Sequence, residues 1–127
     1  MTQSAQRCIQ SGHTAAVYTR RERYDLPGGT KEDQLAISVR ISEALTNVVA
    51  DLSVRPAFLI AKGGITASSV AASALHVKRA RVLGQIAPGI PVWRTDPGSK
   101  FPEIPLVIFP GNVGDDTTLR EIMDTLM

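Results

Sequence analysis

A lysine and two glycines follow directly after an apolar run in the stretch FLIAKGGITASSVAASAL, residues 58–75. The apolar run predicts a buried strand, and the small and hydroxyl residues predict a helix capped by Thr66 or Ser68. Glycines between these elements permit positive φ or close approach by a ligand. Such a turn aims free backbone N–H groups and the positive end of a helix dipole at one spot. The candidates for anion binding there are Gly63, Gly64, Ile65 and Thr66, with Lys62 as an adjacent positive charge.

A plain strand-to-helix turn without a ligand is the alternative for this segment. Neither the P-loop pattern nor the G-x-G-x-x-G fingerprint is present in the chain. A second glycine loop, PGNVGDD at residues 110–116, carries Asp115 and Asp116 at the expected start of the last helix. These carboxylates would repel a phosphate, so the loop suits a ribose, a base or a bridging Mg²⁺ contacted by Asp115. Its alternative is a capped helix start with no ligand.

Strands and helices alternate along the chain. We expect a short helix at residues 3–11, stopped by Gly12. A strand is expected at 14–19, and a long helix begins at a weak Thr30–Asp33 capping box and is ended by Pro56. Further strands are expected at 57–61, 77–86 and 106–109, with a turn at 87–91 and a last helix that places Leu119, Ile122, Met123 and Leu126 on one face. This order predicts an α/β fold in which a mostly parallel sheet carries helices on its faces, in one domain spanning 1–127.

The predicted sheet has an edge where ligands would collect. In open α/β sheets, ligands bind beyond the carboxyl ends of the strands. Three segments follow such ends: the turn after Ala61, the turn after Phe109, and Tyr18–Arg20 after the first strand. We therefore expect these three loops to converge on one edge.

Composition restricts the classes of function. The chain has 127 residues and a formal net charge of +2, which argues against a nucleic-acid partner in the absence of a focused basic patch. Arg20, Arg21 and Arg23 are expected in a solvated loop, and Lys78, Arg79 and Arg81 on a polar strand face. The single cysteine, Cys8, excludes an internal disulfide, and no apolar stretch reaches membrane-spanning length. His13 and His76 lack ligand spacing, so no metal site is assigned, and a cytoplasmic protein without a membrane partner is expected.

Several motifs in one order carry a family resemblance. The series AKGGITASSVA, KRARVLGQI, PGIPVW and FPEIPLVIFPGNVGDD resembles the C-terminal nucleotide-binding domain of the four-carbon acid sugar kinases, from about Val17 to the end. The resemblance implies an ATP- and Mg²⁺-dependent kinase acting on a hydroxyl of a tetronate or 3-oxo-tetronate. The GGIT turn matches the family's phosphate-side loop and the PGNVG turn its second nucleotide loop. The residues carried over from the second loop are Gly111, Asn112 and Gly114.

The sequence departs from the family pattern in three ways. The family's proteins are much longer, and nothing here corresponds to their N-terminal sugar-binding domain. The family's first strand, which ends in a Gly-Ser turn, has no counterpart, and VYTRRE stands where Val-Tyr-Thr-Ser-Arg is frequent. The chain is therefore expected to be a fragment, a truncated product or a subunit of a split enzyme, with the sugar acid and the general base held by a missing domain or partner subunit. No catalytic residue is assigned, and the open sheet edge predicts self-association.

A second hypothesis belongs to another class of function. The chain could be a non-catalytic interaction or regulatory module that retains the fold without binding a ligand. A functional kinase subunit needs a partner that supplies the sugar-binding domain, whereas a regulator or relic does not.

Overall fold

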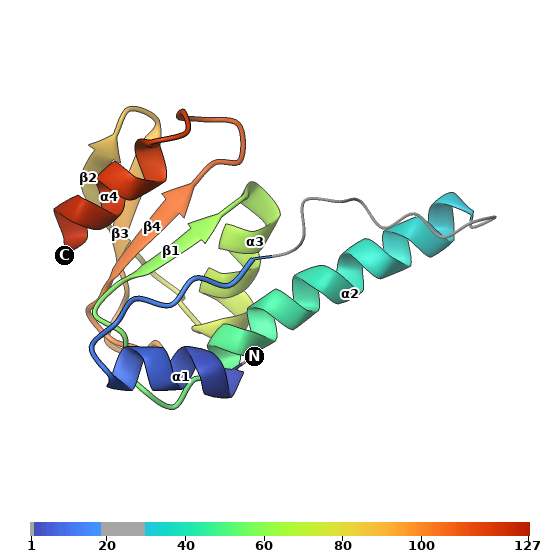
Figure 1. The fold of residues 1–127 in the computed structure, drawn as a ribbon, viewed down its shortest axis with the longest axis horizontal. Helices are drawn as coiled ribbons and strands as arrows, with labels where there is room; N and C mark the ends of the chain where they lie inside the picture. Colours follow the sequence, from blue (N-terminus) through green and yellow to red (C-terminus); the bar gives the residue numbers. More distant parts are fainter. Residues whose placement is uncertain (1, 19–29) are drawn as a thin grey trace. The chain divides into compact units, whose positions relative to one another are not determined.

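The computed structural model describes residues 2–18 and 30–127, without the side chain of Gln34. The chain divides into two compact units, Met1–Val54 and Arg55–Met127, whose ribbons are shown in Figure 1. None of the described helices is long and apolar enough to cross a membrane.

The described residues of the first unit form two helices, α1 (Thr2–Gln10) and α2 (Lys31–Ala50). Gly12, with φ 81°, follows α1, which agrees with the expected stop. The capping box of α2 is complete: Asp33 N–H donates to Thr30 Oγ1, and Thr30 N–H donates to Asp33 Oδ2, both at 3.2 Å. Aspartate therefore replaces the usual glutamate in the box, and the long helix predicted from the sequence is confirmed.

Two expectations for the first unit were wrong. Residues 14–18 form no strand, and residues 19–29, which include Arg20, Arg21 and Arg23, lie outside the described part of the chain. Strand propensity alone does not make a strand, because the backbone groups also need a ladder partner. In addition, α2 ends at Ala50, six residues before Pro56, with Asp51 N–H bonded to Asn47 O.

The second unit contains a four-stranded sheet in the order β1-β4-β3-β2. Its elements are β1 (Leu59–Lys62), α3 (Gly64–Ser69), the π-helical turn η1 (Val70–Ala74), β2 (Arg81–Ala87), β3 (Ile90–Arg94), β4 (Pro105–Phe109) and α4 (Thr118–Leu126).

The sheet is mixed, so the α/β class is confirmed but the mostly parallel arrangement is wrong. Only β1 and β4 pair in parallel; β3 runs antiparallel to both β4 and β2. The cause is the two-residue connection Pro88–Gly89, because so short a link can join only antiparallel neighbours. Gly89, with φ 76°, supplies the left-handed conformation that the hairpin turn requires.

Successive side chains of β4 point to opposite faces of the sheet, and a different helix covers each face. Val107 and Phe109 belong to a core cluster with Ile122 of α4. The alternate residue Ile108 lines a hollow together with Ala67 of α3. Because successive strand residues point to opposite faces, α4 and α3 cover opposite faces of the sheet, as expected for this class (Figure 1).

The α3 helix begins earlier than the sequence suggested. Its N-cap is Gly63, with φ 104°, rather than Thr66 or Ser68. The helix continues into η1, where Leu75 N–H donates to Val70 O across five residues. The whole helical segment is therefore entered through a glycine in a conformation that other residues rarely adopt.

A buried threonine organises the loop between β3 and β4. Thr95 is 1% exposed; its Oγ1 donates to Phe101 O at 2.6 Å and accepts from Ile104 N at 3.0 Å. Its own N–H donates to Ile104 O at 3.1 Å. This hydroxyl satisfies a buried donor and a buried acceptor, and so fixes where β4 begins.

We expect Thr95→Val to lower the free energy of unfolding by about 1–3 kcal/mol, because it leaves a buried N–H group without a partner. Urea denaturation followed by circular dichroism measures the change. The matched control is Thr125→Val: the exposed Thr125 hydroxyl also donates to a backbone carbonyl, Glu121 O at 3.0 Å. A surface change of this kind should stay within about 0.5 kcal/mol. Equal effects of the two variants would contradict the role of Thr95.

Candidate functional site

The two glycine loops lie side by side. Lys62 at the end of β1 pairs with Phe109 at the end of β4. Just beyond them, Gly63 N–H donates to Phe109 O at 2.8 Å. A Cβ built on Gly111 would lie 3.8 Å from Gly63 Cα, so the two loop backbones are in contact. The parallel pair therefore brings the two loops together at its carboxyl end, where the strand-end argument placed them.

Only one of the two glycines in the first loop needs to be glycine for conformational reasons. Gly63 has φ 104°, and Thr66 Oγ1 lies 3.7 Å from the position of its missing Cβ. Gly64 lies in the helix, its φ is outside the left-handed range, and a Cβ there would meet nothing within 4 Å. The expectation of positive φ thus holds at Gly63, and Gly64 leaves open space above the helix start.

The first turn of α3 presents backbone donors. Ala67 N–H donates to Gly63 O at 2.8 Å and closes the first turn. The N–H groups of Gly64, Ile65 and Thr66 precede that bond and have no partner inside the helix. Ile65 is 78% exposed, which is unusual for an isoleucine in a helix that packs on a sheet. These groups form a small patch of donors at the positive end of the helix, where Gly64 and Ile65 are exposed and Thr66 is half-buried.

The second loop is shaped by Gly114 and the start of α4. Gly114 has φ 86°, and a Cβ there would lie 2.8 Å from Thr118 Oγ1. That hydroxyl accepts from Asp115 N at 2.8 Å. Gly114 is therefore required by the α4 start itself, whereas Gly111 and Asn112 stand exposed at the tip of the loop.

The carboxylate of Asp115 is engaged within its own turn. Its Oδ1 accepts from Thr117 N at 3.0 Å, Thr117 Oγ1 at 2.9 Å and Thr118 Oγ1 at 3.0 Å. These bonds, the backbone and hydroxyl of Thr117 first, lower the pKa of Asp115. Asp115 therefore stabilises the turn that precedes α4. This role corresponds to the alternative stated for this loop, a capped helix start with no ligand. Within the described residues no group of three or more His, Cys, Asp or Glu side chains could hold a metal ion.

A third loop reaches the same edge, and sequence reasoning missed it. A Cβ on Gly89 would lie 3.4 Å from Val113 Cγ1, so the β2–β3 turn touches the second glycine loop. Gln85 Oε1 accepts from Gly89 N at 3.1 Å and closes this turn. The available signal was Pro88–Gly89 between two alternating segments, which favours a hairpin and returns the chain to this edge. The third loop that we expected, Tyr18–Arg20, belongs to the first unit, and its residues 19 and 20 lie outside the described part.

Lys62 stands beside the two loops. Its side chain is exposed, and its Nζ lies 5.2 Å from the centroid of the Phe109 ring. A cation over an aromatic face is stabilised by about 0.5–1 kcal/mol at an exposed site. This contact keeps a positive charge at the end of β1, next to the exposed donors of α3.

The hydrogen bonds to Asp115 predict a dependence of stability on pH. Because its pKa is lower in the folded chain than in the unfolded one, the stabilisation is complete above the usual aspartate pKa of about 3.9 and is lost as pH falls through the folded value. We expect Asp115→Asn to lower the melting temperature at neutral pH. The gap from the wild type should close on acidification toward pH 3.

Thermal melts from about pH 3 to pH 7 measure this gap, across the range in which a carboxylate titrates. Asp116→Asn is the control, because Asp116 makes no hydrogen bond among the described residues. The Asp116→Asn variant should lose melting temperature on acidification in the same way as the wild type. A gap for Asp115→Asn that stays constant down to the lowest pH would contradict the capping role.

Comparison with known proteins identifies the family. A family model described as the nucleotide-binding C-terminal domain matches residues 1–119 and so runs through both compact units. No curated protein and no solved structure matches the chain. The matched span contains both glycine loops and the hairpin turn beside them, and it agrees with the resemblance drawn from the sequence motifs. The chain belongs to the family of nucleotide-binding C-terminal domains.

Proposed function

We propose that the chain is the ATP-binding part of a kinase that phosphorylates a four-carbon sugar acid, a tetronate or 3-oxo-tetronate. The observation that carries the proposal is the contact between the two glycine loops at the carboxyl ends of β1 and β4. Family membership supports a nucleotide as the ligand. The motif resemblance supports the sugar acid as the phosphoryl acceptor.

The first loop is the proposed phosphate side of the site. Gly63 turns the chain so that the N–H groups of Gly64, Ile65 and Thr66 are exposed at a helix start. Each hydrogen bond from such a group to a charged phosphate oxygen contributes about 1.5–3 kcal/mol. The open space above Gly64 lets the phosphate approach the backbone, and Lys62 adds a point charge.

The second loop is the proposed nucleoside side. Gly111 and Asn112 are exposed at its tip, while Gly114 shapes the loop. The Asn112 amide offers both a donor and an acceptor for a base or a ribose. Asp115 Oδ1 is occupied by threonine donors, so Mg²⁺ would enter with ATP, held mainly by phosphate oxygens and water. Bound in that way, Mg²⁺ supplies charge neutralisation on the phosphates.

Phosphoryl transfer requires positioning and charge neutralisation more than covalent chemistry from the protein. On this proposal the chain orients the phosphates along the helix start. The sugar acid and the general base belong to another domain or a partner subunit. The chain's own contribution is to hold the nucleotide, and its residues act as binding groups.

We expect Gly63→Val to abolish ADP binding measured by calorimetry, because a β-branched residue is strained at φ 104° and would displace the helix start. Two control variants separate binding from strain. Gly12→Ala introduces a side chain at φ 81° in the first unit, where nothing lies within 4 Å, and should leave ADP affinity unchanged. Gly64→Ala should weaken binding less than Gly63→Val. Unchanged affinity in folded Gly63→Val would remove this loop from the site.

We also expect that the chain alone will not phosphorylate a sugar acid. A few N–H bonds give several kcal/mol, and association costs at least about 4 kcal/mol, which leaves affinity near the millimolar range. ATP held in this way would also lack a base for the sugar hydroxyl. Incubation with ATP, Mg²⁺ and a panel of tetronates, followed by mass spectrometry, is the measurement. A phosphorylated acid formed at enzyme-like rates would mean that the chain builds a complete active site. No ADP binding at all would favour the non-catalytic module.

A further inference from the structure

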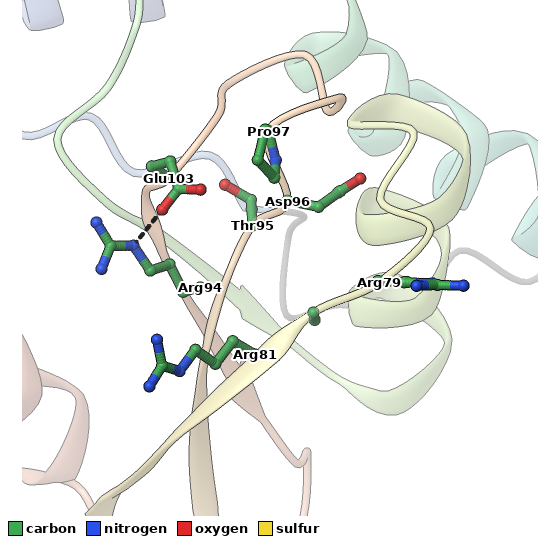
Figure 2. A pocket seen from close by; sticks show the side chains of 8 residues that line it. Arg79, Arg81, Arg94, Thr95, Asp96, Pro97 and Glu103 are labelled. Carbon is green, nitrogen blue, oxygen red and sulfur yellow. Dashed lines mark ion pairs between the residues drawn. The ribbon is translucent and has the colours of Figure 1, made fainter.

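A hollow lined by three arginines lies at the other end of the sheet. It lies between the start of β2 and the loop that follows β3, and has a volume of about 280 Å³. The charged residues that line it are Arg79, Arg81, Arg94, Asp96 and Glu103 (Figure 2). Three guanidinium groups against two carboxylates give the hollow a net positive charge.

Two of the arginines face each other across strands. Arg81 and Arg94 are direct partners in the antiparallel pair of β2 and β3. Figure 2 shows their guanidinium groups on the same side of the hollow. Like charges directly opposite each other destabilise a sheet. Among the described residues, Arg81 forms no ion pair, so nothing in this part of the chain neutralises it. An anion between the two groups would relieve their repulsion.

Glu103 orients one of these guanidinium groups. Its Oε2 lies 2.6 Å from Arg94 Nε, with both side chains nearly half exposed. Because only Nε is engaged, the terminal nitrogens of Arg94 remain available as donors. Glu103 has φ 61°, a conformation uncommon for a non-glycine residue, and its N–H donates to Thr95 O at 3.2 Å. The loop therefore carries local backbone strain at Glu103, the residue whose carboxylate contacts Arg94.

Asp96 does not take part in this arrangement. Its Oδ1 is buried and has no hydrogen-bond partner among the described residues, so a ligand in the hollow cannot reach it. In Figure 2 its carboxylate points away from Arg81 and Arg94. The pair of arginines is therefore the part of the hollow that can receive an anion.

We propose that this hollow binds a small oxyanion, a phosphate ester or a carboxylate. Its oxygens are held between Arg81 and the terminal nitrogens of Arg94. Two guanidinium forks provide paired N–H donors that suit the oxygens of either anion. The proposal is independent of the proposed function.

The proposed oxyanion site is separate from the nucleotide loops. Arg94 pairs with Pro105 at the start of β4, whereas the loops follow Phe109 at its end. At about 3.3 Å per residue, these two ends are about 13 Å apart along the strand. One ligand group cannot contact the backbone at both ends.

The test is a titration of the ¹⁵N-labelled chain with inorganic phosphate, glycerol 3-phosphate and glycerate, followed by NMR. We expect saturable shifts in residues 79–82 and 94–96. Comparison of glycerol 3-phosphate with glycerate shows whether a phosphate or a carboxylate is preferred. Shifts in residues 63–66 are scored separately, because phosphate binding there belongs to the nucleotide site.

Two variants decide the outcome. Arg81→Ala should weaken binding at residues 79–82 at least tenfold, whereas Arg120→Ala, which removes an exposed arginine from α4, should change it less than twofold. If Arg81→Ala unfolds the chain, Arg81→Gln replaces it, with the same expectation. Equal weakening by the Arg81 and Arg120 variants, or no saturable shift at residues 79–82, would overturn the proposal.

Discussion

The hydrogen bond from Gly63 N–H to Phe109 O holds the candidate nucleotide site together. It continues the parallel pairing of β1 and β4 by one step beyond the strands, into the loops themselves. The chain turns at this point, with φ 104° at Gly63, and enters α3. The pairing of β1 with β4 therefore places the start of α3 next to the second glycine loop. The tip of the second loop, at Gly111, rests on the same glycine.

The hairpin of β2 and β3 contributes to a candidate site at each end of the sheet. Its turn at Pro88–Gly89 lies beside Val113 and completes the edge at which the glycine loops meet. Its open end carries Arg81 opposite Arg94 and lies at the beginning of β4. An all-parallel sheet would have placed these segments elsewhere, since a crossover would have separated β2 from β3. The mixed topology thus determines which residues share each end.

Much of the local backbone structure around the candidate site could be predicted from residue types, and the errors have physical causes. An apolar run followed by Lys62 and Gly63 was enough to predict a strand and a turn, because both signals are local. The capping box at Thr30 was also local. Strand β3 was not among the predicted strands, because Pro88, Gly89 and Pro91 are turn formers and residues 87–91 were assigned to a turn. Arg81 therefore had no predicted strand partner, and the arginine hollow could not be predicted. Gly114 was assigned to the nucleotide loop, yet the α4 start also requires a glycine there, because a Cβ would lie 2.8 Å from Thr118 Oγ1.

The parallel pair of β1 and β4 also has a kinetic consequence. The hairpin joins Ala87 to Ile90, whereas β1 must find β4 by pairing Leu59 with Leu106. Closing the longer loop has a larger entropic cost, so the β2–β3–β4 ribbon should form first and β1 should dock last. Because β1 docks last during folding, we expect it to be the first strand to detach from the sheet in the native ensemble. The amide hydrogen of Gly63 then reports the docking equilibrium directly, since its exchange with solvent requires that β1 leave the sheet edge.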